Sequence, residues 1–178
     1  MKSLFTIHAG EFLVASYIER KFKEFEIWLP SKDTGVDLLL TKPKKNIGLQ
    51  VKYSINYALT TLNPAYRINT RAIGWFRLNR KSIKDSKADF WVFVIYIEAA
   101  KEYDFILIHP VDLLKKLDSI HGVKDKIDCY FQITEAKKCF ETRGLKKADC
   151  IAISKGTYIS GNRDFALYLN NWNLINKI

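Results

Sequence analysis

The stretch SKDTGVDLLLTKPKKNIGLQVKYS, residues 31–54, decides the fold of this chain because it contains two strands joined by a short turn. Residues 36–40 and 47–53 are rich in Val, Leu and Ile, a composition typical of strands. The Pro, Lys and Asn residues between them favour a tight turn, so the two strands are expected to be antiparallel neighbours.

One face of this hairpin is expected to carry polar side chains. Because side chains alternate along a strand, Gln50 and Lys52 point away from the apolar face. If Lys42 pairs with Lys45 across the turn, counting back along both strands places Asp37 beside Gln50. Two apolar strands do not need these polar side chains to fold, so we interpret them as parts of a functional site.

Residues 8–24 are expected to form a helix whose inward face carries a carboxylate. Val14, Ile18 and Phe22 recur at steps of three and four, and Glu11 continues this stripe. A buried carboxylate is costly unless it is paired or binds a metal. The alternative is that Glu11 is stabilised by the dipole at the helix N-terminus.

Apolar patterns predict the remaining elements. The continuous apolar run at 90–97 is typical of a central strand covered on both faces. The other expected elements are strands at 26–29, 103–109 and 147–153, helices at 111–120, 135–143 and 163–175, a helical turn at 81–86, and a loop with short helical pieces over 57–80. This order predicts an α/β fold with a mixed sheet.

The excess positive charge lies in one segment. The 178-residue chain has a net charge of +10, and residues 42–87 hold eleven Lys and Arg side chains against one acid, Asp85. The rest of the chain is neutral overall. Lys and Arg side chains neutralise phosphates, and aromatic rings stack on nucleobases. The segment therefore favours nucleic acid as the partner ahead of an anionic membrane. A solvated basic loop is the alternative.

An acid, an amide and a lysine on one hairpin suit metal-assisted phosphodiester hydrolysis. Carboxylate and amide oxygens are hard ligands of the kind that Mg²⁺ prefers. The metal polarises the phosphoryl oxygen and lowers the pKa of a bound water. A lysine beside it can orient that water and stabilise the charge that develops in the transition state.

The runs GEFLVASYIERKF and EIWLPSKDTGVDLLLTKPKKNIGLQVKYS resemble the PD-(D/E)XK nuclease superfamily, which has the restriction-endonuclease-like fold. Glu11 matches the helix glutamate of the family pattern, Asp37 the metal-binding aspartate and Lys52 the catalytic lysine. Gln50 stands where the pattern has a second acid. The resemblance covers residues 8–54.

The resemblance implies an αβββαβ core with a mixed central sheet flanked by helices. We expect a single nuclease-like domain over residues 1–178, with a basic DNA-binding insertion at 54–87. The implied activity is that of a Mg²⁺-dependent DNA endonuclease, in which Mn²⁺ can substitute. Restriction, homing and junction-resolving enzymes share this scaffold, so the expected partners are double-stranded or branched DNA and a second copy of the chain.

The same resemblance assigns roles to individual residues. The implied metal ligands are Asp37, Gln50, Glu11 and the backbone carbonyl of Val51. The residues expected to contact DNA are Lys42, Lys44, Lys45, Tyr53, Ser54, Arg67, Arg71, Arg77, Arg80, Lys81 and Lys84.

The neutral side chain of Gln50 keeps other functions open. Its oxygen can ligate a metal but adds no charge. The first alternative is therefore a catalytically weak or inactive DNA-binding protein of the same fold. The charge alone also allows an RNA-directed nuclease.

Other residues carry weaker signals. Cys129, Cys139 and Cys150 lack zinc-ligand spacing and are expected to be reduced thiols. His8 and Asp33 are interpreted as a capping or surface histidine and a turn former. No apolar run reaches the ~18 residues of a membrane span, and the N-terminus lacks the pattern of a signal peptide, so a cytoplasmic protein is expected.

Overall fold

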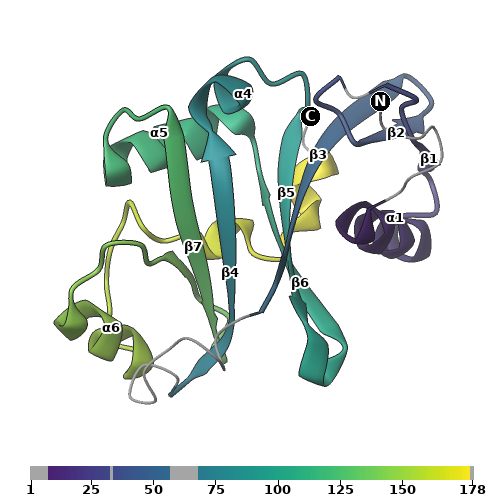
Figure 1. Ribbon diagram of the computed structural model, residues 1–178. Helices are drawn as coiled ribbons and strands as arrows, with labels where there is room; N and C mark the ends of the chain where they lie inside the picture. The colour runs from purple at the N-terminus through teal and green to yellow at the C-terminus, as the bar shows by residue number, and fades with distance from the viewer. Residues whose placement is uncertain (1–7, 33, 57–67, 177–178) are drawn as a thin grey trace.

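The computed structural model describes residues 8–32, 34–56 and 68–176 (Figure 1). Its elements are α1 (Ala9–Lys21), β1 (Glu26–Trp28), β2 (Leu38–Lys42), β3 (Lys45–Ile55), β4 (Thr70–Asn79), α4 (Arg80–Lys84), β5 (Phe90–Ile97), η1 (Glu98–Ala100), β6 (Glu102–Ile108), α5 (Pro110–His121), β7 (Lys126–Thr134), β8 (Cys139–Glu141), α6 (Lys147–Ser154), η2 (Ala166–Tyr168) and η3 (Trp172–Asn176). None of the helices in these ranges combines the length and apolar character that a membrane crossing requires.

The central sheet has five strands in the order β1-β2-β3-β5-β6. Strands β3 and β5 are parallel, whereas the other neighbours are antiparallel. Strand β5 is an interior strand, between β3 and β6, and seven of its eight residues are buried, as its continuous apolar run predicts. The expected α/β fold with a mixed central sheet flanked by helices is confirmed.

Two apolar clusters cover the two faces of this sheet. On one face, α1 packs through Val14 and Ile18 onto Leu49 and Val51 of β3. On the other face, α5 and a second sheet of three strands, in the order β4-β7-β8, enclose the remaining core. Figure 1 shows α1 beside β3 on the right and the pair β4–β7 on the left. The polar face of β3 therefore looks toward the second sheet.

Strand β4 crosses the central sheet at close range. A Cβ atom at Gly74 would lie 2.7 Å from Cγ1 of Ile95 and 2.8 Å from Cε2 of Phe76. Real Cβ contacts are longer than this, so only glycine lets β4 approach β5 so closely. This approach brings the end of β4 next to the polar face of β3.

The second sheet corrects two expectations. Residues 57–80 are expected to be a loop with helical pieces, but residues 70–79 form β4; residues 57–67 lie outside the described part of the chain. Residues 72–74 are all buried, so the alternation of apolar and polar residues that indicates a strand is interrupted there. Residues 135–143 are expected to be helical, but they contain the strand β8. The neighbouring strand β7 has no counterpart among the expected elements.

The C-terminal third also differs from expectation. Residues 147–153 are expected to be a strand but form α6, in which Asp149 Oδ2 accepts a hydrogen bond from the Lys146 backbone N–H at 3.2 Å. Residues 163–175 are expected to be one helix but form the two short turns η2 and η3. Asn170 has a left-handed backbone with φ 51° between these turns, and its side chain bonds to Phe105 and Asp104 of β6.

The cysteines behave as structural thiols. Cys129 and Cys139 are buried and free, and burial raises the pKa of both thiols well above its ordinary value. A thiol with a raised pKa is a poor nucleophile and a poor metal ligand. Cys129 and Cys139 thus lie in the core, while Cys150 is a free thiol of intermediate burial.

Candidate active site

The β2–β3 hairpin has the expected register. Lys42 pairs with Lys45, and Lys44 adopts a left-handed backbone with φ 64° in the turn between them. The Asp37 backbone N–H donates to the Leu49 carbonyl at 2.7 Å, which extends the pairing one residue beyond β2. The count along the two strands thus places Asp37 beside Gln50, as the sequence predicts.

The Asp37 carboxylate is held by two donors on β3. Gln50 donates a hydrogen bond through Nε2 to Asp37 Oδ2, and the Val51 backbone N–H donates to the same oxygen at 2.7 Å. Within the described ranges, no group donates a hydrogen bond to the other oxygen, Oδ1. These bonds fix the orientation of the carboxylate while one oxygen remains available to a ligand.

The same contact orients the Gln50 amide. Because Nε2 donates to Asp37, the carbonyl oxygen Oε1 is at the free end of the side chain. This oxygen faces Gly35, where an added Cβ would lie 3.9 Å away. Gln50 can therefore offer a neutral oxygen ligand next to the Asp37 carboxylate.

Glu11 serves the helix and also faces the site. It lies in the first turn of α1 and is 9% exposed, and its Oε2 accepts a hydrogen bond from the His8 backbone N–H at 3.0 Å. Its position is thus compatible with both interpretations, a metal ligand and a carboxylate stabilised at the helix N-terminus. Gly10 permits the close seating of α1, because a Cβ there would lie 2.8 Å from Cβ of Tyr53.

Lys52 lies over an aromatic ring that no local sequence pattern indicates. Its ammonium nitrogen is 5.4 Å from the ring centroid of Trp91, within the range of a cation–π interaction. The Trp91 indole N–H donates to Ser86 Oγ at 3.0 Å, and the ring is 2% exposed. The lysine makes no ion pair with any residue that the structure describes. Trp91 therefore offers a fixed surface for the Lys52 side chain.

These residues line one open pocket of about 810 Å³. Glu11, Asp37, Gln50, Val51 and Lys52 form one side. The opposite side comes from the end of β4, from α4 and from the loop that follows; its polar members are Arg77, Asn79, Ser82, Asp85, Ser86 and Lys87. The structure thus brings all four predicted catalytic residues together.

The donor set of this pocket fits a hard divalent cation. It offers the carboxylates of Glu11 and Asp37 and the amide oxygen of Gln50, and all of these are oxygen donors of the kind that Mg²⁺ prefers. The described residues contain no group of three or more His, Cys, Asp and Glu side chains that could hold a metal. A metal in this pocket would therefore depend on the neutral ligand Gln50.

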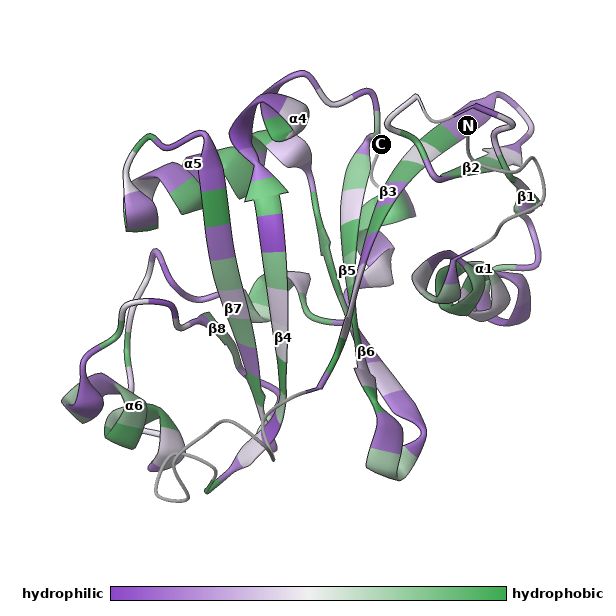
Figure 2. Cartoon of the chain, viewed as in Figure 1, coloured by the Kyte–Doolittle hydropathy of each residue, from purple (hydrophilic) through white to green (hydrophobic). Residues whose placement is uncertain are grey.

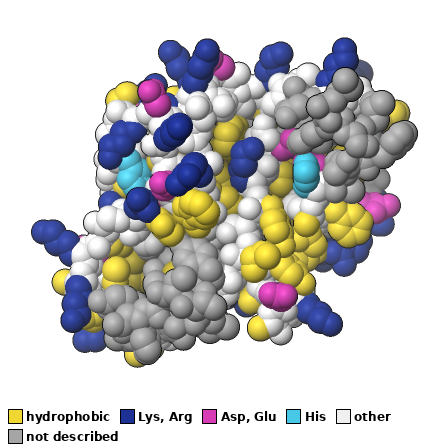
Figure 3. Space-filling view, in the orientation of Figure 1, with side chains coloured by type: hydrophobic (Ala, Val, Ile, Leu, Met, Phe, Trp, Pro, Cys, Tyr) yellow, Lys and Arg dark blue, Asp and Glu magenta, His cyan; other side chains and the backbone are white. Residues whose placement is uncertain are grey.

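Most of the residues expected to bind DNA fall into two groups. Arg71, Arg77 and Arg80 form ion pairs within the protein at 2.6–2.8 Å, and the Lys45 ammonium donates to the Ile175 carbonyl at 2.8 Å. Within segment 42–87, the exposed lysines without an ion pair to the described residues are Lys44, Lys81, Lys84 and Lys87; the last is not among the residues expected to contact DNA. Figure 3 shows basic side chains over α4 and the adjoining ends of β4 and β7.

Other predicted contacts have mixed surroundings. The Lys42 ammonium nitrogen lies 4.5 Å from the ring centroid of Phe25. Tyr53 is 37% exposed beside the pocket. Ser54 Oγ accepts a hydrogen bond from the Trp75 backbone N–H at 3.1 Å. Arg67 and Asp33 lie outside the described residues.

Arg71 belongs to a structural network that joins β4 to β6. It donates to Asp104 at 2.7 Å and to Glu102 at 2.6 Å. Burial alone would raise the pKa of Asp104, but hydrogen bonds from Asn170 and Arg71 outweigh it and hold the pKa below its ordinary value. A phosphate would have to displace these carboxylates, so Arg71 is better suited to holding β4 and β6 together.

Comparisons with known proteins give one weak structural similarity. No protein-family model and no curated protein matches the chain. The fold is similar to the solved structure of a bacterial homing endonuclease, I-Ssp6803I, with 18% sequence identity, 94% of this chain and 88% of that chain covered, and a TM-score of 0.43. We therefore assign the site from the residues of this chain alone.

Proposed function

We propose that this protein is a divalent-metal-dependent endonuclease of the PD-(D/E)XK type that hydrolyses phosphodiester bonds in DNA. The observation that supports it is the single pocket that collects Asp37, Gln50, Lys52 and Glu11 from a hairpin and a helix. Their chemistry suits the reaction, because two carboxylates and an amide oxygen lie beside a lysine without an ion pair to the described residues.

Asp37, Glu11, Gln50 and the Val51 carbonyl would hold Mg²⁺ or Mn²⁺ in this proposal. Such a metal, when bound, supplies positive charge to a phosphoryl oxygen and lowers the pKa of a coordinated water. The hydrogen bonds from Gln50 and Val51 would keep the Asp37 carboxylate oriented before the metal arrives. Preorientation of this kind lowers the cost of assembling the site.

Lys52 would act on the nucleophile and on the developing charge. Its ammonium would orient the attacking water and stabilise the additional negative charge on the phosphorane-like transition state. Cleavage would leave 5′-phosphate and 3′-hydroxyl ends. The part of the chain that the structure describes has one pocket with this set of side chains, so cutting both strands of a duplex would require a second copy, and we propose a homodimer.

Cleavage of plasmid DNA tests the proposal. Supercoiled plasmids carrying a pool of random inserts, and branched DNA, are incubated with the protein in Mg²⁺, in Mn²⁺ or in EDTA. We expect nicked or linear products with either metal and none with EDTA. Equal cutting in EDTA would overturn the metal-dependent mechanism, and cutting of RNA but not DNA would overturn the substrate.

A DNA-binding protein without nuclease activity is the second candidate, and Gln50 is the observation that favours it. The amide replaces a charged ligand by a neutral one, which weakens the attraction for a metal. DNA binding without cleavage under any metal would support this candidate. The Gln50→Glu variant then separates two cases, because cleavage restored by the added carboxylate would identify Gln50 as the cause of the lost activity.

Trp91→Leu is expected to slow cleavage by about tenfold, because a cation–π contact contributes roughly 0.5–2 kcal/mol to holding the Lys52 ammonium. Trp91→Phe keeps an aromatic face and should lose much less. Single-turnover cleavage and DNA affinity in EDTA are measured for both variants. Affinity should stay the same, and equal cleavage rates for the Leu and Phe variants would show that the ring does not position Lys52.

A further inference from the structure

The outer face of the β4–β7 pair carries a row of polar and aromatic side chains that the core does not use. The two strands are antiparallel, and three of their cross-strand pairs face outward: Trp75 with Tyr130, Arg77 with Asp128, and Asn79 with Lys126. Figure 2 shows hydrophilic and hydrophobic residues alternating along both strands. We call these six residues the outer ladder.

The core of the protein uses only the inner face of the same ribbon. Phe76 and Leu78 of β4 and Cys129 and Phe131 of β7 are buried in the core between the two sheets. By contrast, Trp75 is 43% exposed. The exposed part of the Trp75 ring is not used by the core, so it can contact a partner that lies on this face together with the charged side chains of the ladder.

The outer ladder borders the proposed active site. Arg77 and Asn79 line the same pocket as Asp37 and Lys52. Asn79 also ends the ribbon, since its Oδ1 accepts a hydrogen bond from the Ser82 backbone N–H at 3.1 Å and caps α4. A polymer held on the ladder would therefore continue directly into the pocket.

The ladder side chains are already ordered. Arg77 Nε donates to Asp128 Oδ1 at 2.8 Å, and its guanidinium lies 5.4 Å from the Trp75 ring centroid. The hydrogen bond from Arg77 holds the pKa of Asp128 below its ordinary value. Neither Nη group of Arg77 bonds to the described residues, so both remain available to a partner while the stem of the side chain is fixed.

We propose that the β4–β7 ribbon enters the major groove of duplex DNA, where Arg77 reads a guanine next to the scissile phosphate. This inference rests on the proposed function. The major groove is about 12 Å wide and admits a two-stranded β-ribbon, whereas the minor groove is about 6 Å wide. Arginine pairs with the O6 and N7 acceptors of guanine. The flanking basic surface, with Lys81 and Lys84, would bind the phosphates on either side.

Arg77→Lys tests the reading of a base, because lysine keeps the positive charge but lacks the planar fork of donors. Duplexes with a randomised central stretch are bound in EDTA, and the bound fraction is sequenced. We expect the unmodified protein to enrich guanine at one position, and Arg77→Lys to lose about tenfold of that preference. Affinity for random duplexes and its dependence on salt should stay unchanged in this variant.

Lys81→Ala is the comparison variant for backbone contacts. Lys81 is exposed on α4, outside the ladder. Its loss should weaken binding to every sequence alike and reduce the slope of log affinity against log salt by about 0.9, the change expected for one phosphate contact. The two variants therefore separate reading of a base from neutralisation of a phosphate.

The outcomes distinguish this inference from the proposed function. An unchanged base preference in Arg77→Lys would overturn the role of the ribbon, and so would tighter binding to an RNA duplex, whose deep and narrow major groove excludes a ribbon. Both measurements are made in EDTA and do not need cleavage. A protein that reads sequence but never cuts would overturn the nuclease proposal alone.

Discussion

Asp37→Asn is expected to reduce DNA cleavage by about 10³-fold or more, because it removes the charge on which both metal binding and transition-state stabilisation depend. Asparagine has nearly the same size, and its oxygen can still accept the hydrogen bond from the Val51 backbone N–H. The hairpin should therefore stay folded. Single-turnover cleavage in saturating Mg²⁺ measures the effect.

Asp85→Asn is the matched control for this prediction. Asp85 lines the same pocket from the opposite side, but it is exposed and contacts neither Asp37 nor Gln50 through a hydrogen bond. The two variants change the net charge equally. Cleavage should be nearly normal in Asp85→Asn, and both variants should bind DNA in EDTA at least as well as the unmodified protein. Normal cleavage in Asp37→Asn would place the reacting centre elsewhere.

The candidate site could be predicted because it lies on local structure. The hairpin register follows from a short turn and from strict alternation along two strands, so Asp37 and Gln50 could be paired by counting. The inward position of Glu11 follows from helical periodicity. The ring beneath Lys52 could not be found in this way, because Trp91 comes from β5, and its position depends on the parallel pairing of β3 with β5.

The second sheet escaped prediction for a different reason. Strand β4 is buried on both faces near Gly74 and on one face near Arg77, so no single period describes it. The helix predicted at 163–175 fails because Asn170 is committed to β6 through its side chain, which is a long-range effect. The missed elements thus share a dependence on contacts between segments distant in sequence.

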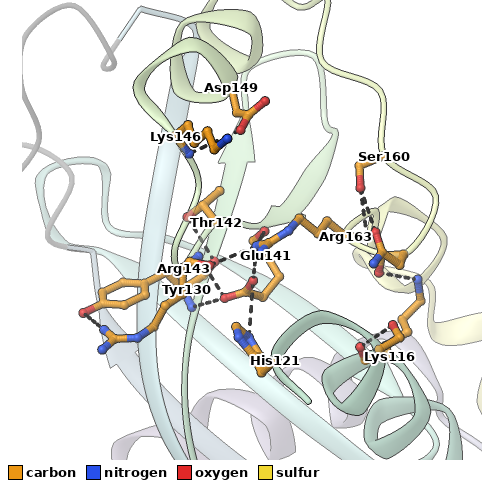
Figure 4. A network of polar contacts seen from close by, with 12 residues as sticks. Lys116, His121, Tyr130, Glu141, Thr142, Arg143, Lys146, Asp149, Ser160 and Arg163 are labelled. Carbon is orange, nitrogen blue, oxygen red and sulfur yellow. Dashed lines mark hydrogen bonds and ion pairs between the residues drawn. The ribbon is translucent and has the colours of Figure 1, made fainter.

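Arg163→Met is expected to destabilise the protein by about 3–5 kcal/mol, because it leaves a buried carboxylate without its main counter-charge. The Glu141 side chain is 0% exposed, and Arg163 Nη1 donates to its Oε2 at 2.7 Å (Figure 4). The same nitrogen also bonds to the carbonyls of Glu141 and Arg143, each at 3.0 Å. One side chain therefore joins β8 to the loop that precedes η2.

The remaining contacts of Glu141 cannot replace this arginine. Its Oε1 accepts hydrogen bonds from the backbone N–H groups of Tyr130 at 3.2 Å and Arg143 at 3.0 Å, and His121 Nε2 lies 3.4 Å from Oε2. Backbone donors carry no net charge, so they offset only part of the cost of burying a carboxylate. Removal of the Arg163 guanidinium should therefore destabilise the whole second sheet and not only β8.

Arg143→Met provides the matched control, since it makes the same substitution in the same network. Arg143 contacts Tyr130 through its side chain and lies 4.0 Å from Asp128, and its side chain is 46% exposed, so its removal should cost less than about 1 kcal/mol. Urea unfolding followed by circular dichroism compares the two variants. Equal unfolding midpoints would show that the Glu141 carboxylate does not need a charged partner. A large loss in Arg163→Met alone would instead show that this buried ion pair, which no local sequence pattern reveals, fixes β8 against the C-terminal segment.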